Sequence, residues 1–202
     1  MELILIRHLK TPGNEKRQYI GSTDEELSEQ EVLNFKQKYK IDSYPQVQQV
    51  IVSPMKRCIQ TAELIYPKNQ ITQEVLLKEC DFGIFEGLTY KEIKEKYPQE
   101  LARWNKEFST YQIPEGESFL DVRRRVEAFL KDIPSGEENK SEKMLVTAHK
   151  GTLGHLLAAM LKLPPEGYWN FVFDQGCYSE VDLEDGYAII RKLNAKEIPM
   201  NM

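Results

Sequence analysis

Residues 5–14, LIRHLKTPGN, change within two positions from an apolar strand to a basic segment rich in turn-forming residues. The mostly apolar run over residues 2–6 predicts a short strand that is buried on both faces. Arg7 and His8 follow it directly, so two basic side chains stand at the carboxyl end of this strand. Taken alone, such a pair is typical of the solvated end of a strand, and its meaning depends on what the rest of the chain places beside it.

A second apolar run, over residues 47–52, also ends in polar and basic residues. Ser53 and Pro54 close the run, and Arg57 follows within one helical turn. A serine followed by a proline is typical of a helix N-cap with proline in the first turn, so a helix is predicted over residues 55–65 with Ser53 as its cap.

A third apolar run, over residues 144–148, ends at His149. In open α/β sheets, ligands bind outside the carboxyl ends of the strands. If the three runs are neighbouring parallel strands, four basic side chains converge at that edge: Arg7, His8, Arg57 and His149. Each of them alone is more often an ordinary surface or satisfied side chain, but the threefold repetition of the same context favours a functional site.

Helical and alternating periodicities predict the remaining elements. Helices are expected over residues 29–40, 91–108, 119–130 and 153–161, strands over residues 71–76, 178–183 and 187–192, and a polar linker over residues 135–143. The last two strands flank Glu184-Asp185-Gly186 and are predicted to form a hairpin. Alternating strands and helices predict an α/β fold, a three-layer sandwich with a mostly parallel sheet, helices on both faces and a C-terminal edge hairpin. We expect a single domain, residues 1–202, in which residues 80–118 form a helical lid insert over the active site.

Composition limits the partners of the chain. The net charge of -5 over 202 residues argues against nucleic acid or an anionic membrane surface as the main partner. No apolar run has the length of a membrane span and no signal-peptide pattern follows Met1, so a cytoplasmic location is expected. The three cysteines, Cys58, Cys80 and Cys177, lack CxxC spacing and are interpreted as reduced, partly buried thiols. The sequence leaves the choice between a monomer and a homodimer open.

The four converging side chains suit a phosphoryl group, because arginine presents a planar fork of donors to phosphate oxygens. An imidazole with one nitrogen hydrogen-bonded to a carbonyl exposes the other nitrogen as a nucleophile at neutral pH. Attack on phosphorus also needs a proton for the leaving oxygen, and Glu79, in a predicted loop, is the candidate donor. The expected partner is therefore a small phosphomonoester.

These residues belong to a longer set of motifs through which the chain resembles the histidine phosphatase superfamily, also called the phosphoglycerate-mutase-like family. The motifs occur in the order of that family along essentially the whole chain: Leu5-Ile6-Arg7-His8, Thr11 with Asn14, Gly21 with Asp24 and Leu27, Ser53-Pro54 with Arg57, Gln60-Thr61-Ala62, Leu77 with Glu79, Gly83, Glu86-Gly87, Pro114 with Gly116-Glu117-Ser118, Arg125, and Thr147-Ala148-His149-Lys150-Gly151.

The resemblance implies a role for each matching site residue. His8 is implied as the nucleophile that forms a phosphohistidine, and Glu79 as the group that protonates the leaving oxygen and later activates water. Three residues are implied to hold the phosphoryl oxygens: Arg7, Arg57 and His149. Two more match positions near the phosphate and the substrate: Asn14 and Gly21. The resemblance implies neither a metal nor a cofactor.

The chain departs from the usual pattern of the family directly after the nucleophile, where Leu9 and Lys10 replace a glycine and a glutamate. Lys10, together with Lys150 in place of a small glycine, makes the mouth of the site more positive and is expected to favour a phosphate dianion. Leu9 is tolerated at little cost if its φ is negative and is strained if its φ is positive.

Near the C-terminus, the run Asp174-Gln175-Gly176-Cys177 followed by an aromatic residue resembles the alpha-ribazole phosphatase branch of the family. That branch removes phosphate from alpha-ribazole 5'-phosphate or its cobalamin-bound form during assembly of the cobalamin nucleotide loop. The mutases of the family have a basic pair in the segment that here reads WNKEF, residues 104–108, and its absence favours a phosphatase. Three alternatives stay open: a broad-specificity histidine phosphatase, a phosphoglycerate mutase and a non-catalytic binder of phosphate ligands.

Overall fold

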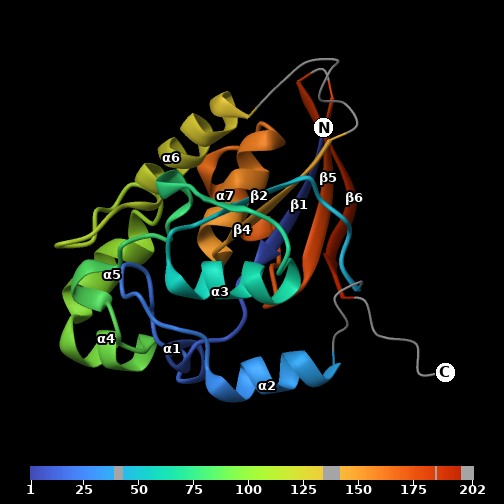
Figure 1. Ribbon diagram of the computed structural model, residues 1–202. Coiled ribbons are helices and arrows are strands. Elements are labelled where there is room, and N and C mark those ends of the chain that lie inside the picture. The colour runs from blue at the N-terminus through green and yellow to red at the C-terminus, as the bar shows by residue number, and fades with distance from the viewer. Residues whose placement is uncertain (39–42, 134–141, 185, 197–202) are drawn as a thin grey trace.

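The fold is built on one six-stranded sheet with the strand order β3-β2-β4-β1-β5-β6 (Figure 1). A computed structural model describes residues 1–38, 43–133, 142–184 and 186–196. The strands are β1 (Glu2–Arg7), β2 (Gln49–Val52), β3 (Ile71–Gln73), β4 (Lys143–Ala148), β5 (Tyr178–Glu184) and β6 (Tyr187–Ala195). The first four pair in parallel, and the β5–β6 hairpin joins β1 in antiparallel orientation at one edge. The predicted α/β fold with an edge hairpin is confirmed.

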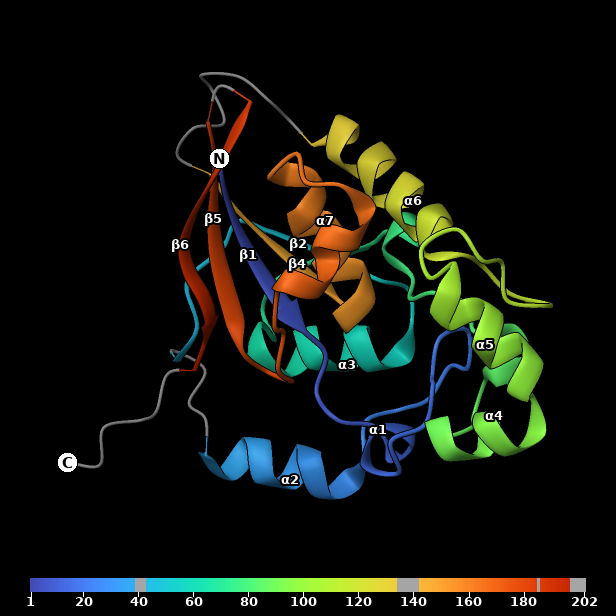
Figure 2. The same ribbon diagram turned by 180° about the vertical axis from the view of Figure 1, so that it is seen from behind.

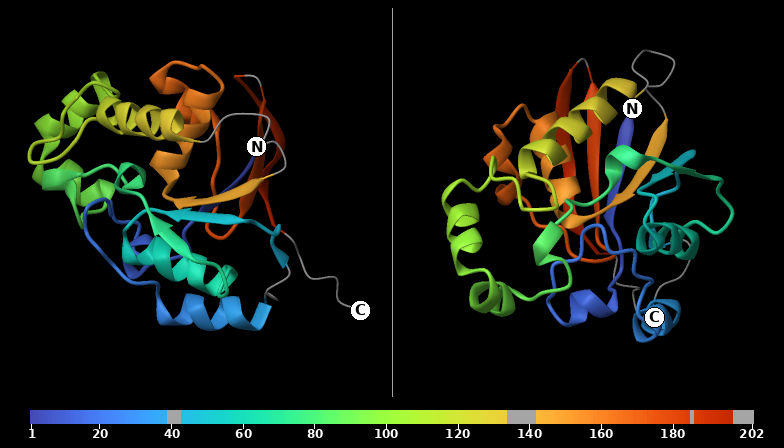
Figure 3. Two further views of the ribbon diagram at one scale, coloured as in Figure 1. Left: turned by 45° about the horizontal axis from the view of Figure 1, so that its top comes forward. Right: turned by 90° about the vertical axis from the view of Figure 1, so that its left-hand side faces the viewer.

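Helices cover both faces of this sheet (Figure 3, left). The α-helices are α1 (Pro12–Glu15), α2 (Glu29–Lys38), α3 (Lys56–Ile65), α4 (Tyr90–Lys96), α5 (Pro98–Lys106), α6 (Phe119–Asp132) and α7 (Lys150–Met160). Helices α6 and α7 pack on one face, and α2 and α3 pack on the other. None of the helices in the described part of the chain combines the length and the apolar composition needed to cross a membrane.

The central strand β1 separates two hydrophobic cores. Successive side chains of a strand point to opposite faces, so Leu3 and Leu5 join the core under α6 and α7, while Ile4 and Ile6 join the core under α2 and α3. All four side chains are fully buried, and each such burial contributes on the order of 2 kcal/mol. Two-sided burial explains why the strand is apolar without alternation, and it fixes the position of the residues that follow it.

The predicted insert, residues 80–118, contains α4 and α5, which lie together on the side of the molecule away from the β5–β6 hairpin (Figures 1 and 2). Its buried side chains form a third apolar cluster with Ala158 of α7 and with Tyr168. The role of the insert as a lid stays a prediction.

The prediction of a single helix over residues 91–108 is wrong. Helix α4 ends at Lys96 and α5 begins at Pro98, with Tyr97 between them. Proline has no backbone N–H and clashes with the preceding turn, so it ends one helix and starts the next. Tyr97 donates its own N–H to the carbonyl of Ile93 and thereby closes α4.

The strand expected over residues 71–76 is shorter than predicted. It stops at Gln73, because the carboxylate of Glu74 accepts the N–H of Leu76 at 2.9 Å and caps a 3-10 turn over Val75–Leu77. The predicted helix over residues 29–40 is observed through Lys38. Residues 39 and 40, the linker residues 135–141 and Asp185 lie outside the described residues.

Candidate active site

Three neighbouring parallel strands bring the candidate site residues to one edge of the sheet. Arg7 pairs in register with Ala148, and Val52 with Thr147, so the residues after β1, β4 and β2 lie side by side. The rings of His8 and His149 contact each other edge to face, with centroids 5.1 Å apart. The convergence expected from the repeated strand ends is present.

His8 is held as a neutral imidazole whose Nε2 has no hydrogen-bond partner among the described residues. Its Nδ1 lies 2.7 Å from the carbonyl oxygen of Leu9, and since a carbonyl only accepts, Nδ1 carries the proton and Nε2 keeps its lone pair. Burial lowers the pKa of His8 well below its usual value, and the positive charges of Arg57 and Arg7 lower it further. A neutral imidazole with an exposed Nε2 lone pair can attack phosphorus.

Arg57 is 1% exposed, and each nitrogen of its guanidinium donates one hydrogen bond within the protein. Nη1 and Nη2 donate to the carbonyls of Thr23 and Gly21, each at 2.8 Å, and Nε donates to Nδ1 of His149 at 3.2 Å. The predicted site residue Gly21 therefore contacts the cluster through its backbone carbonyl, which orients Arg57. Among the described residues, Nη1 and Nη2 each have one acceptor, so the second N–H of each is available to an anion.

His149 has a protein partner at each ring nitrogen. Because the guanidinium of Arg57 can only donate, Nδ1 of His149 accepts, so Nε2 carries the proton and donates to the hydroxyl of Ser53 at 2.8 Å. Burial, followed by the charge of Arg57, lowers the pKa of His149 well below its usual value. The thiol of Cys58 also lies 3.5 Å from Nε2, so a phosphoryl oxygen bound by this ring would have to replace one of these partners.

The contact between Ser53 and His149 corrects the N-cap predicted at Ser53. Helix α3 begins at Lys56, its N-cap residue Met55 makes no side-chain cap, and the N–H of Lys56 donates instead to Asp24 at 2.8 Å. The hydroxyl of Ser53 faces the neighbouring strand end, because the chain needs two more residues to turn from β2 into the helix. Ser53 is therefore a residue of the site and not the N-cap of α3.

Arg7 is anchored at one end only. Its Nη1 donates to the carbonyl of Phe173 at 2.9 Å, whereas its buried Nε has no partner among the described residues. Burial lowers the pKa of Arg7, and the nearby carboxylates of Glu79 and Asp174 partly offset this effect. An unpaired buried N–H costs free energy unless a ligand meets it, so this donor is a candidate for a phosphoryl oxygen.

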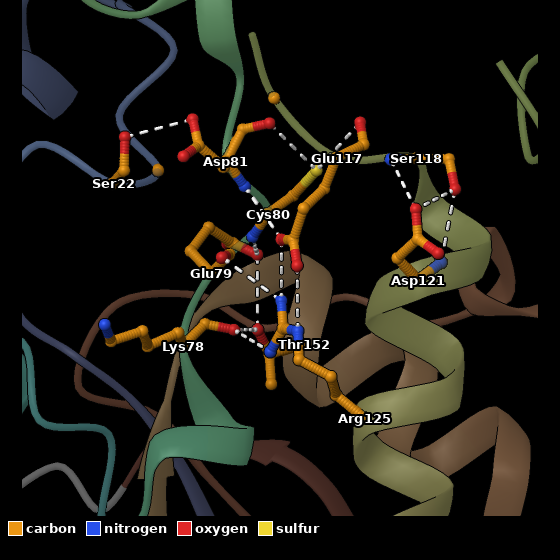
Figure 4. A network of polar contacts seen from close by, with 12 residues as sticks. Ser22, Lys78, Glu79, Cys80, Asp81, Glu117, Ser118, Asp121, Arg125 and Thr152 are labelled. Atoms are coloured by element: carbon orange, nitrogen blue, oxygen red, sulfur yellow. Dashed lines mark hydrogen bonds and ion pairs between the residues drawn. The ribbon is translucent and has the colours of Figure 1, made fainter. Parts of the chain in front are cut away.

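Glu79 lies in an irregular segment beside the N-terminus of α7 (Figure 4). Its carboxylate accepts hydrogen bonds from the N–H of Gly151 at 3.2 Å, the hydroxyl of Thr152 at 3.2 Å and the N–H of Cys80 at 3.1 Å. The charge of this carboxylate acts on Arg7, so Glu79 lies near the cluster, and its role as proton donor stays a prediction.

Three further predicted residues have no described contact with the side chains of this cluster. The side chain of Asn14 accepts the N–H of Thr11 at 3.3 Å in a capping box at the start of α1. Lys150 is exposed at the first position of α7. Lys10 lines a cavity of about 460 Å³ between α2 and residues 174–177. Substrate contacts by these three residues stay predictions.

Leu9 occupies the position after the nucleophile without strain. The non-glycine residues with positive φ in the described part of the chain are Arg17, Glu115, Lys162 and Asn194, so Leu9 keeps a negative φ. Its side chain is 2% exposed in the core under α2 and α3, and its N–H donates to the hydroxyl of Thr61 at 3.0 Å. The replacement of the usual glycine at this position costs no backbone strain.

Glu86 is a residue of the site whose role the sequence does not reveal. Its carboxylate accepts the N–H groups of Gly21 and Ser22, each at 2.9 Å, and the hydroxyl of Thr23 at 2.7 Å. The carbonyls of two of these residues hold Arg57, so Glu86 fixes the loop that orients the arginine. The sequence signal was the Glu86-Gly87 motif, but no pattern shows which amides a distant carboxylate reaches.

Comparison with known proteins agrees with this geometry. The sequence profile of the histidine phosphatase superfamily (branch 1) matches residues 3–196. The adenosylcobalamin/alpha-ribazole phosphatase of Salmonella typhimurium is 27% identical over 200 residues, which cover 98% of each chain. Phosphoserine phosphatase 1 of Hydrogenobacter thermophilus is 30% identical over 196 residues, which cover 96% of this chain and 92% of the relative.

A solved structure extends the likeness to three dimensions. The alpha-ribazole phosphatase from Shigella flexneri shares the fold with a TM-score of 0.86 at 26% identity, over 100% of both chains. The resemblance inferred from the motifs is thereby confirmed. The chain belongs to the histidine phosphatase superfamily, branch 1, and is a hydrolase of the phosphatase class.

Proposed function

We propose that this phosphatase hydrolyses small phosphomonoesters through a phosphohistidine formed on His8. The observation that carries the proposal is the hydrogen bond from Nδ1 of His8 to the carbonyl of Leu9, because it directs the free Nε2 lone pair to the cluster. Nε2 attacks phosphorus, the bond from phosphorus to the leaving oxygen breaks, and the protonated carboxyl of Glu79 gives that oxygen its proton.

The second half of the reaction returns the enzyme to its starting state. Water attacks the phosphohistidine, the carboxylate of Glu79 takes the proton of that water, and the N–P bond breaks to release inorganic phosphate. Arg7 and Arg57 stabilise the charge on the phosphoryl oxygens in both steps, and His149 assists them once it exchanges a partner. The buried setting strengthens each of these charge interactions.

For the substrate, we propose alpha-ribazole 5'-phosphate or its cobalamin-bound form. Support comes from the full-length likeness to enzymes that carry this name in Salmonella typhimurium and Shigella flexneri. Phosphoserine is the second candidate, because phosphoserine phosphatase 1 of Hydrogenobacter thermophilus is 30% identical at similar coverage. The cytoplasmic location and the homodimer considered from the sequence stay predictions.

A substrate panel tests this proposal. We expect kcat/KM for alpha-ribazole 5'-phosphate to exceed that for phosphoserine, p-nitrophenyl phosphate and 3-phosphoglycerate by about tenfold or more, which is about 1.4 kcal/mol of transition-state discrimination. A flat profile indicates a broad-specificity phosphatase, and formation of 2-phosphoglycerate with a bisphosphoglycerate primer indicates a mutase.

The mechanism has a separate test. Brief incubation with a radiolabelled phosphomonoester should leave an acid-labile phosphoryl group on the protein, and His8→Ala should lose both this label and turnover. His155→Phe is the matched control, since His155 lies buried in α7 against Tyr168 and Phe119. Retained turnover in His8→Ala contradicts the mechanism, and ligand binding without hydrolysis in the wild type supports the non-catalytic alternative.

A further inference from the structure

The segment that carries Glu79 lacks the usual support of a helix or strand. Residues 78–82 form neither, and they connect the 3-10 turn Val75–Leu77 to the 3-10 turn Gly83–Phe85. A proton donor must be held within hydrogen-bond reach of the leaving oxygen, and a misplacement of about 1 Å can cost about a hundredfold in rate. Something outside the segment therefore has to fix the position of Glu79.

We propose that Arg125 of α6, paired with Glu117, is the positioning residue that holds Glu79 in place as the proton donor. This inference rests on the function proposed above. Arg125 does not touch the reacting groups in our scheme, and it acts through the backbone on which Glu79 is mounted (Figure 4).

The guanidinium of Arg125 donates to two carbonyls of the segment and to one carbonyl of the 3-10 turn before it. Nη1 donates to Leu76 at 2.9 Å and to Lys78 at 3.0 Å, and Nη2 donates to Glu79 at 3.4 Å. One planar guanidinium thus binds the backbone carbonyl of Glu79 and two carbonyls that precede it in the chain. A lysine has a single ammonium group and cannot reproduce this fork.

Glu117 forms an ion pair with Arg125, and the two residues together are called the clamp. Its two carboxylate oxygens accept from Nε of Arg125 at 3.1 Å and from Nη2 at 2.9 Å, which is the bidentate geometry of a strong ion pair. The same Oε2 accepts the N–H of Asp81 at 3.1 Å. The pair therefore fixes the backbone on both sides of Glu79, and both side chains are largely buried, at 20% and 29% exposure.

The anchor itself is rigid. Helix α6 begins with a capping box between Ser118 and Asp121, and Val126 and Phe129 lie in the core next to β1. Glu117 directly precedes the N-cap and Arg125 lies two turns further along, so the same helix holds both residues of the pair. This arrangement gives a physical reason for the motif of Gly116-Glu117-Ser118 with Arg125, which the proposed mechanism leaves without a function.

The test compares two substrates that differ in their need for a proton donor. p-Nitrophenyl phosphate releases a phenolate that is stable without protonation, whereas ribose 5-phosphate releases an alkoxide that is not. The ratio kcat/KM is measured for both, since it reports the steps up to phosphoryl transfer to His8. We expect Arg125→Lys to lower kcat/KM about tenfold to a hundredfold for ribose 5-phosphate and less than about threefold for p-nitrophenyl phosphate, because general acid catalysis contributes about 10²–10⁴-fold.

Glu117→Gln and Glu79→Gln should show a split of the same sign, the latter the larger. Arg124→Lys is the matched control, because Arg124 lies next in α6, is 67% exposed and pairs with Asp121 alone among the described residues; it should equal the wild type on both substrates. An equal loss on both substrates, or no loss, in folded Arg125→Lys overturns the inference, and Glu117→Gln decides the matter if Arg125→Lys does not fold. Turnover retained by His8→Ala would instead refute the proposed function, so the two failures are distinguishable.

Discussion

The hydroxyl of Ser53 accepts a 2.8 Å hydrogen bond from Nε2 of His149 across the ends of β2 and β4. Both residues are fully buried. The tautomer of His149 follows from Arg57, which can only donate to Nδ1, and this leaves the proton on Nε2 for the hydroxyl of Ser53. One serine at a strand end therefore influences the orientation of both the histidine and the arginine.

Replacing Ser53 with Ala should reduce both stability and activity. The buried N–H of His149 loses its oxygen partner and keeps only the weak acceptor Sγ of Cys58 at 3.5 Å, which costs up to about 1–3 kcal/mol. A less firmly held ring should lower kcat/KM by about tenfold, or about 1.4 kcal/mol. Urea unfolding and steady-state kinetics measure the two effects. Ser109→Ala is the control, because the hydroxyl of Ser109 donates to Glu166 at the surface; wild-type kinetics in Ser53→Ala would show that the ring needs no such partner.

The protonation of His155 should make the stability of the fold depend on pH. It is buried in α7, neither ring nitrogen has a hydrogen-bond partner in the described structure, and burial together with the charges of Arg123 and Arg125 lowers its pKa from 6.5 to about 4. Below pH 6.5 the unfolded chain takes up a proton that the folded chain takes up only near pH 4. Stability is therefore complete above pH 6.5 and decreases by up to about 3 kcal/mol as the pH falls to 4.

The variant His155→Phe isolates this effect. Phenylalanine can stack on Tyr168 as the imidazole does, at 4.3 Å between centroids, and leaves no polar atom unsatisfied. We expect the variant to be at least as stable as the wild type at pH 7 and to show a smaller loss of unfolding free energy between pH 6.5 and 4. Chemical denaturation at several pH values measures this, and an unchanged slope would assign the pH dependence to the other buried histidines.

Shortening the side chain of Leu9 should lower the stability of the fold without affecting catalysis. Its side chain fills a site against Gly176, where an added Cβ would approach within 2.7 Å of Leu9 Cδ2. Leu9→Ala should destabilise the fold by about 2–5 kcal/mol through the cavity it leaves. Because the backbone bond to Thr61 persists, kcat/KM of the folded protein should stay within about threefold of the wild type. Leu33→Ala, at a side chain that is 54% exposed in α2, should change neither quantity.

The sequence predicted the convergence of Arg7, His8, Arg57 and His149 because that convergence follows from local information. Each residue stands at the end of an apolar run, and parallel strands place their ends together. Helices with a regular apolar face, such as α6, were predicted for the same reason, because the spacing of apolar residues within the helix determines which face is buried.

The interactions that the sequence did not predict join residues far apart in the chain. The sequence around Ser53 predicts a helix cap, and only the neighbouring strand β4 gives Ser53 its contact with His149. The sequence around Glu86 predicts a loop carboxylate, but its oxygens bind residues 21–23, more than sixty positions away. The structure adds for Lys10 only that it lines a cavity beside α2, and its contact with the substrate stays a prediction. The position of a charged residue in the sequence indicates that it lies near the site, but not the direction in which its side chain points.

Gly151 gives a prediction in which stability and activity move in different directions. A Cβ at this position would lie 2.7 Å from Oε1 of Glu79, which is the far end of a flexible side chain, so the carboxyl can shift while the backbone stays in place. Gly151 lies in the first turn of α7, where alanine is the better helix former by up to about 1 kcal/mol. Gly151→Ala should therefore keep or raise the thermal midpoint.

The same substitution should displace the proton donor. We expect kcat/KM of Gly151→Ala to fall about tenfold to a hundredfold for ribose 5-phosphate and much less for p-nitrophenyl phosphate, since only the first leaving group depends on Glu79. Gly154→Ala is the control on the same helix, where an added Cβ would meet Tyr168 at 3.1 Å instead of Glu79; it should alter stability without separating the two substrates. A parallel loss on both substrates in Gly151→Ala would mean that the added methyl group obstructs the phosphoryl group itself, and that Glu79 is not what Gly151 makes room for.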